Sequence, residues 1–194
     1  MSGWLSAEHS MRAAERILDA AAAEFAERGV AATQMADIAK AAGCSRATLY
    51  RYFDSRRAVQ RAFVHRAARR VGAQVAAEIH DIGDPAAQLV AGVLASLRVV
   101  RADPLLIAWF RPGDAGLALE LAETSAVVTA IADSLPATAG DAAHDPGEPS
   151  LAQWLTRVIV SLLTVPGGTE AEERAVLERF VAPLIRTGSR PATG

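Results

Sequence analysis

The sequence predicts an all-α protein of about nine helices, because three kinds of observation agree. Apolar residues recur at three- and four-residue spacing along most of the chain, which is the period of a helix with one buried face. Ala, Leu, Arg and Glu, all favourable in helices, dominate the composition. Capping residues and glycine stops also divide the chain into helix-sized pieces. We expect a small N-terminal bundle of three helices and a larger C-terminal helical part.

Size and composition narrow the class of protein. A chain of 194 residues with 51% hydrophobic content can bury a sizeable core. The N-terminal segment MSGWLSAEHS lacks the basic start and apolar run of a signal peptide, and no later run is long enough to span a bilayer, so we expect a cytoplasmic protein with no membrane span. The single Cys44 and four scattered histidines give neither a disulfide nor a metal-ligand spacing, so no metal and no cofactor are expected.

Charge is unevenly distributed along the chain. The whole chain has a formal net charge of -2, but residues 1–70 carry 12 Arg and Lys against 7 Asp and Glu. Residues 71–194 carry 8 against 15. A basic half joined to an acidic half indicates that the N-terminal part meets a polyanion, although uneven decoration of a solvated surface would give the same count.

Three helices are expected in the N-terminal part. The first should follow Ser10 and run to Arg28, where Gly29 supplies its stop. Thr33 is the expected N-cap of the second, and Ser45 that of the third. Short helices joined by tight glycine turns are typical of a DNA-binding bundle rather than of an enzyme core.

The C-terminal part should begin with a long connecting helix that ends near Ile79. Two Asp-Pro pairs predict the next two starts, since proline fits the first helical turn and aspartate accepts its free N–H groups; they are Asp84-Pro85 and Asp103-Pro104. Residues 115–135 resume a helical pattern, and residues 136–149 are expected to form a loop. Two capping boxes, led by Ser150 and Thr169, should start two strongly apolar helices, the last ending near Arg186.

One stretch carries the function. Residues 29–57 read GVAATQMADIAKAAGCSRATLYRYFDSRR. They closely resemble the N-terminal helix-turn-helix of the tetracycline-repressor (TetR) family of bacterial transcriptional regulators. The matching positions are Thr33, Ile38-Ala39, Ala42-Gly43, Ser45, Thr48-Leu49-Tyr50, Tyr52-Phe53 and Ser55, with Arg56 where the family usually has Lys. Cys44 replaces the usual Val, and we expect it to pack as a small hydrophobe.

The physical requirements of a helix-turn-helix agree with this resemblance. Leu49 and Phe53 should point inward, which leaves the polar side of the third helix for the groove. Arginines and hydroxyls can bond phosphates and base edges, and a small alanine can lie against a thymine methyl. Residues 10–57 are therefore the expected DNA-binding domain, and the expected contacts with double-stranded operator DNA are Thr33, Arg46, Ala47, Thr48, Tyr50, Arg51, Tyr52 and Arg56.

The resemblance implies that residues 58–188 bind a small effector and form a homodimer. For an apolar effector, with an anionic end met by an arginine, the candidate contacts are Leu97, Arg98, Arg101, Trp109, Phe110, Leu121 and Ser125. The last two helices carry apolar faces too wide to cover each other, which favours a dimer on physical grounds as well. The candidate interface residues are Leu151, Trp154, Leu155, Val158, Ile159, Leu162, Leu177, Phe180, Val181 and Leu184.

The leading hypothesis is a dimeric repressor that an effector releases from a palindromic operator. A DNA-bound scaffold that recruits a protein partner through its apolar C-terminal helices, without an effector, is the alternative. An enzyme is not expected, because no nucleophile stands at a recognisable spacing from a base and no glycine-rich phosphate loop is present.

Overall fold

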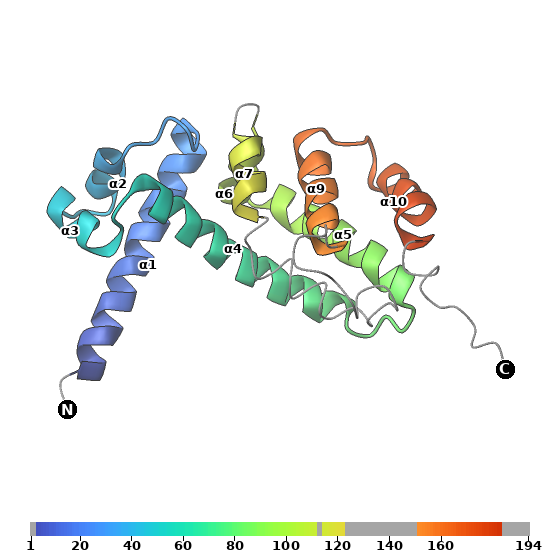
Figure 1. The fold of residues 1–194 in the computed structure, drawn as a ribbon, viewed down its shortest axis with the longest axis horizontal. Helices are drawn as coiled ribbons and strands as arrows, with labels where there is room; N and C mark the ends of the chain where they lie inside the picture. The colour runs from blue at the N-terminus through green and yellow to red at the C-terminus, as the bar shows by residue number, and fades with distance from the viewer. Residues whose placement is uncertain (1–2, 112–113, 123–150, 184–194) are drawn as a thin grey trace, which may run out of the picture.

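The long helices α4 (Arg56–Ile79) and α5 (Pro85–Ala102) pack against each other and link the two ends of the molecule (Figure 1). The structure is a computed structural model, and it describes residues 3–111, 114–122 and 151–183. Over these residues it has nine α-helices, one 3₁₀ helix and no strand, which confirms the predicted all-α fold.

The N-terminal end consists of α1 (Gly3–Arg28), α2 (Met35–Ala41) and α3 (Arg46–Tyr52). The expected start of α1 after Ser10 is wrong, because the helix begins at Gly3. Serine is tolerated inside a helix, and helix formers such as Ala7 and Glu8 precede it without a proline. Figure 1 shows that the extra turns of α1 project away from α2 and α3.

The turn between α1 and α2 departs from the prediction at Thr33. Gly29 has φ +89°, a conformation that glycine adopts without strain, and it ends α1. Thr33 is fully buried, and its hydroxyl donates to the carbonyl oxygens of Gly29 at 2.8 Å and Glu24 at 3.2 Å. Gln34 is therefore the N-cap of α2, and the expected capping role of Thr33 is wrong.

Most of the other predicted caps are confirmed. In each case the side-chain oxygen accepts a backbone N–H from the first turn of its helix, which satisfies one of the helix's free donors. The residues are Ser45 before α3, Asp84 before α5, Asp103 before α6 (Pro104–Ile107) and Thr169 before α10 (Glu170–Phe180). Ser55, which was not among the predicted caps, caps α4 in the same way. Ser150 lies outside the described residues. These predictions succeed because a cap depends only on residues three or four positions away.

A single large core cluster extends from α1 through α4 and α5 to the last helices. Where the two ends of the molecule meet, Phe63 of α4 stacks on Trp109, with ring centroids 5.3 Å apart and planes 5° from parallel. Trp109 lies in the 3₁₀ helix η1 (Ala108–Phe110). Phe25 of α1 meets both rings edge to face at 5.9 and 5.2 Å. Such pairs add about 0.5–1.5 kcal/mol each beyond burial, so this aromatic cluster stabilises the junction.

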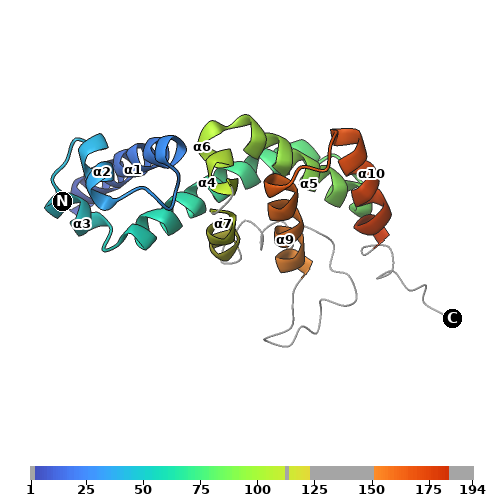
Figure 2. The ribbon, with the colours of Figure 1, turned by 90° about the horizontal axis from the view of Figure 1, so that it is seen from above.

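The C-terminal end is built from α7 (Ala115–Ala122), α9 (Leu151–Thr164) and α10, and α5 packs against both α9 and α10 (Figure 2). The predicted helix over 115–135 is described only as far as Ala122. The predicted loop 136–149 lies outside the described residues. Arg186, near which the last helix was predicted to end, also lies outside them; α10 ends at Phe180.

Three residues expected at a dimer interface belong instead to the core of the protomer. Leu155, Leu177 and Val181 are at most 3% exposed. They are buried because α9 and α10 pack against α5, so these side chains already have partners within the chain. The prediction of interface contact is wrong for these three residues.

Helix α5 has the length and apolar character of a membrane span, and 56% of it is buried inside the protein. It packs against α4, α6, α9 and α10, which is the environment of a core helix. Its hydrophobicity is explained by this packing.

Candidate nucleic-acid interface

The α2–α3 pair has the geometry of a helix-turn-helix. Gly43, at φ +65°, makes the turn, and the Cys44 N–H donates to Ala39 at 3.0 Å. Ile38 and Leu49 are fully buried. Each such side chain contributes about 1.5–3 kcal/mol by leaving water, so the inner sides of α2 and α3 are fixed against the bundle. Cys44 is half-buried and packs against the core, as expected for a small hydrophobe.

The outer side of α3 carries donors and hydroxyls. Arg46, Ala47, Tyr50 and Arg51 are exposed, with Tyr50 at 45%. The Arg51 guanidinium lies 5.4 Å from the centre of the Tyr52 ring, a cation–π contact that orients it along the helix surface. Guanidinium N–H groups and phenol hydroxyls are suited to phosphates and base edges.

Two of the predicted contacts on α3 are partly engaged within the protein. The Thr48 hydroxyl lies 2.9 Å from the Ser45 hydroxyl, and its N–H donates to the same oxygen at 3.0 Å. Tyr52 is half-buried against the core and presents only part of its ring. Both residues therefore hold α3 in place as well as lying on its polar side.

Thr33 and Arg56 both bond the backbone of the α1–α2 turn. Thr33 is buried, and its hydroxyl is used inside the turn. The Arg56 guanidinium donates to the carbonyl oxygens of Ala31 at 2.8 Å and Thr33 at 3.3 Å. Both residues therefore support the α1–α2 turn. Thr33 is too deeply buried for its hydroxyl to meet a phosphate, whereas Arg56 stays half-exposed with its second terminal nitrogen outside these bonds, so its DNA contact remains a prediction.

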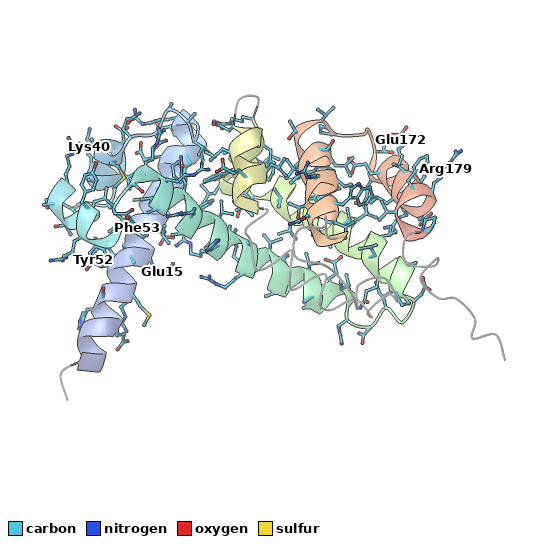
Figure 3. All side chains as sticks on the ribbon, viewed as in Figure 1. Glu15, Lys40, Tyr52, Phe53, Glu172 and Arg179 are labelled. Atoms are coloured by element: carbon cyan, nitrogen blue, oxygen red, sulfur yellow. The ribbon has the colours of Figure 1, made fainter. Side chains whose placement is uncertain are left out.

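Lys40 is a basic residue that the sequence-based prediction missed. It lies exposed in the last turn of α2, at the same end of the molecule as Tyr52, while Glu172 and Arg179 lie on α10 at the opposite end (Figure 3). The signal for it was present, since it is the only lysine of the chain and falls within the helix-turn-helix stretch. Lys40 extends the positive surface of α3 toward α2.

The residues predicted to bind an effector fall in two places. Leu97, Arg98 and Arg101 line a pocket of about 360 Å³ between α5 and α10, together with Leu94, Ala102, Glu170 and Glu173. Trp109 is buried in the aromatic cluster, and Phe110 packs beside it on the core. Leu121 lies on α7, and Ser125 lies outside the described residues.

The two arginines expected to meet an anionic end of the effector already have carboxylate partners within the chain. Both nitrogens at the tip of Arg101 bond the Glu173 carboxylate, at 2.7 and 2.8 Å, and Arg101 also donates to Leu162. This pairing raises the pKa of Arg101 and lowers that of Glu173, against the opposing effect of burial. Arg98 pairs with Glu78 at 2.7 Å, which raises its pKa. Both guanidiniums are therefore charged and already paired with carboxylates of the same chain.

Two buried hydrogen-bond donors were not foreseen from the sequence. The Gln60 amide nitrogen and the Trp109 indole nitrogen have no acceptor within the part of the chain that the structure describes. Gln60 lies on α4 one turn from both Arg57, which pairs with Glu120 of α7, and Phe63, which stacks on Trp109. Both donors therefore belong to the junction of α4 with η1 and α7. Within the described ranges no three His, Cys, Asp or Glu side chains gather to hold a metal ion.

Comparisons with known proteins agree with this geometry. Residues 17–63 match the model of the bacterial regulatory proteins of the tetR family. The chain is 44% identical over 193 residues to the uncharacterized HTH-type transcriptional regulator Rv1255c of Mycobacterium tuberculosis strain H37Rv, covering 97% of this chain and 93% of the relative.

Two solved structures have a similar fold. RolR in complex with resorcinol aligns with a TM-score of 0.61 at 19% identity, over 97% of this chain and 98% of that one. AibR in complex with isovaleryl coenzyme A and operator DNA aligns with a TM-score of 0.52 at 17% identity, over 88% of this chain and 98% of the AibR chain. At these identities the two structures support the fold alone. The relative from Mycobacterium tuberculosis is 44% identical over nearly the whole chain, and that level of identity establishes the family. The chain therefore belongs to the TetR family of helix-turn-helix transcriptional regulators.

Proposed function

We propose that this regulator is a repressor that places α3 in the major groove of a palindromic operator and leaves it when a small molecule binds. The observation that carries the proposal is the outer side of α3. Arg46 and Arg51 are exposed there, and neither has a carboxylate partner among the described residues. A duplex supplies the missing anions, and the neighbouring Ala47 leaves room for a base edge.

A homodimer is the second part of the proposal. Apolar side chains that the protomer leaves exposed lie on α9 and α10: Trp154 at 41%, Val176 at 50% and Phe180 at 61%. Val158, Ile159 and Leu162 are half-buried on α9. Exposed apolar patches of this kind mark interfaces, and a twofold pairing would give two α3 helices for two half-sites.

The proposed effector is mostly apolar and carries a hydrogen-bond acceptor. Support comes from the donors of Gln60 and Trp109, which find no acceptor among the described residues. A buried donor without a partner costs about 1–3 kcal/mol, which an acceptor on the effector would recover. The rings of Phe25, Phe63 and Trp109 favour an apolar body. RolR and AibR were solved with resorcinol and isovaleryl coenzyme A, which is consistent with ligand control in this fold.

DNA binding is tested by selecting duplexes from a random pool with the full-length protein. We expect a palindromic sequence to be enriched, and the double variant Arg51→Ala, Tyr52→Ala to bind it at least 10-fold more weakly. Each phosphate contact removed should also flatten the log–log salt dependence by about 0.9. Arg69→Ala, an exposed arginine on α4, is the matched control and should bind like the native protein. Equal binding by the double variant and the control would reject the assignment of α3.

The scaffold alternative makes a different prediction for the purified protein. A repressor that pairs with itself should sediment as a dimer, and Phe180→Glu should convert it to a monomer. A protein that reserves its exposed α9–α10 face for another protein should sediment as a monomer already. Resorcinol and small acyl compounds can then be screened for release of the selected DNA.

A further inference from the structure

The turn between α1 and α2 has the backbone geometry of an anion-binding nest. Gly29 is in the left-handed region at φ +89°, and the N–H groups of the next two residues, Val30 and Ala31, point toward the same acceptor. Successive N–H groups arranged in this way form a concave site of positive potential. The turn leads directly into α2, so whatever holds it also holds the helix-turn-helix.

This nest is occupied by a carboxylate from the other end of the molecule. One oxygen of Asp114 accepts the Ala31 N–H at 3.0 Å, and the other accepts the Val30 N–H at 3.3 Å across 84 residues of sequence. Asp114 is only 7% exposed, and no cation pairs with it among the described residues. Its charge is therefore balanced by the backbone N–H groups of the turn, which makes the contact specific to a carboxylate.

Asp114 is fixed at the start of α7. Its carbonyl oxygen accepts the N–H groups of Leu117 at 3.0 Å and Ala118 at 3.1 Å. In both ribbon views α7 lies between the N-terminal helices and α9 (Figures 1 and 2). The carboxylate therefore projects from a helix of the C-terminal part into a turn of the N-terminal part.

Two further contacts connect the α1–α2 turn, α4 and α7 to one another. Arg56 of α4 holds the carbonyl side of the same turn through Ala31 and Thr33. Arg57, the next residue, pairs with Glu120 of α7. The turn, the start of α4 and α7 are thus joined pairwise, and Arg111 adds a bond at 2.7 Å to the carbonyl oxygen of Ala26 at the end of α1.

We propose that Asp114 is a positioning residue for operator binding, because its carboxylate sets the orientation of α2 and α3 relative to the C-terminal helices. Arg57 pairs with Glu120 on α7, and Arg111 bonds the end of α1. Among the described residues, only the Asp114 carboxylate accepts the N–H groups of the turn itself. Without it, the helix-turn-helix remains attached through α4 and the aromatic cluster but is free to rock. The effect on DNA rests on the proposed function, whereas the effect on orientation does not.

The test compares Asp114→Ala with Asp84→Ala. Asp84 also accepts a backbone N–H, from Ala87 at 2.7 Å, but it caps α5 inside the C-terminal part. Both variants lose a carboxylate-to-backbone bond, and only one loses a bond between the two ends. Asp114→Asn keeps the size of the side chain and is used in place of alanine if Asp114→Ala does not fold.

Orientation is measured directly by the distance between two spin labels. Cysteines replace the exposed Ala47 on α3 and Ala171 on α10 in a Cys44→Ala chain, and labelled protein is diluted with unlabelled protein so that only distances within one protomer count. We expect a narrow distribution of label-to-label distances for the chain that keeps Asp114 and for Asp84→Ala, and a broadened or shifted distribution for Asp114→Ala. Equal distributions for the two variants would overturn the proposal.

DNA supplies the second readout. The selected duplex is compared with the same duplex in which one half-site is scrambled. Asp114→Ala should lose about 10-fold in affinity for the intact site and keep its affinity for the single half-site, because each helix-turn-helix is intact and only their mutual placement suffers. Equal losses on both duplexes would mean that the turn itself has unfolded and would count against a positioning role. If selection enriches no sequence, the proposed function has failed, and the label distance alone decides the role of Asp114.

Discussion

The arginines of α3 and those of α5 have opposite surroundings. On α3, Arg46 and Arg51 are exposed and have no carboxylate partner among the described residues. On α5, Arg98 pairs with Glu78 and Arg101 with the buried Glu173. Lone surface cations suit an anionic partner, whereas the paired arginines tie elements of the fold together.

This difference shows that residue type alone does not identify a ligand contact. Arg101 was a sensible candidate for an anionic effector until its partner, 72 residues away in the sequence, was located. Changes at Arg46 and Arg51 should therefore alter DNA affinity with little effect on stability, and changes at Arg101 should do the reverse.

The largest effect is expected from Arg101→Met. This change leaves Glu173, at 1% side-chain exposure, buried without its cation, which should lower the free energy of unfolding by about 3 kcal/mol. The corresponding fall in Tm is roughly 6–12 °C for a chain of this size. Thermal and urea unfolding measure it. Arg98→Met breaks an exposed ion pair and should cost less than about 1 kcal/mol. Equal losses for the two variants would show that the buried pair contributes no more to stability than the exposed one.

The second effect is a dependence of stability on pH, and it is smaller because protonation removes the charge but leaves the side chain in place. The Arg101 hydrogen bonds lower the pKa of Glu173 in the folded protein below its unfolded value of about 4.3. The stabilisation is therefore present above about pH 4.3 and is lost as the pH falls through the lowered folded pKa.

Urea unfolding between about pH 6 and pH 2 follows this loss. Glu173→Gln should flatten the acid side of the stability curve, whereas Glu178→Gln, an exposed carboxylate on the same helix, should leave it unchanged. A curve of the same slope for Glu173→Gln would show that the pair does not govern acid stability.

The smallest effect concerns Ser45, which caps α3. Ser45→Ala should lower the free energy of unfolding by about 1 kcal/mol, because the Thr48 N–H loses its acceptor. Ser45→Asp keeps a capping oxygen but adds a negative charge beside the DNA, so stability should be retained while affinity falls. The two variants, measured by unfolding and by DNA binding, separate the support of α3 from its contact. Parallel losses in both properties for Ser45→Asp would argue against a DNA-facing position.

The sequence predicted those features of the fold that depend on neighbouring residues. The caps at Ser45, Asp84 and Asp103 were correct because donor and acceptor lie within one helical turn. The inner residues of the helix-turn-helix, such as Leu49, were correct because their spacing matches the helix period.

Features that depend on distant partners were not predictable. Thr33 turned inward because Gly29 places a carbonyl within reach of its hydroxyl. Leu177 was assigned to a dimer because its helix period gives a buried face but not the element that covers it, which is α5. Asp114 lies outside any motif, and its role became visible only when its bonds to Val30 and Ala31 were located.

The stack of Trp109 on Phe63 gives the protein an optical probe of its own. An indole buried among rings emits at shorter wavelength than one in water, and Trp109 is 3% exposed while Trp154 is 41% exposed. In a Trp4→Phe, Trp154→Phe chain, the remaining emission would report on the α4–η1 junction alone. In a Trp4→Phe, Trp109→Phe chain, a blue shift of Trp154 with rising concentration would follow self-association. Movement at the junction and pairing of subunits can thus be watched separately by fluorescence, without an attached dye.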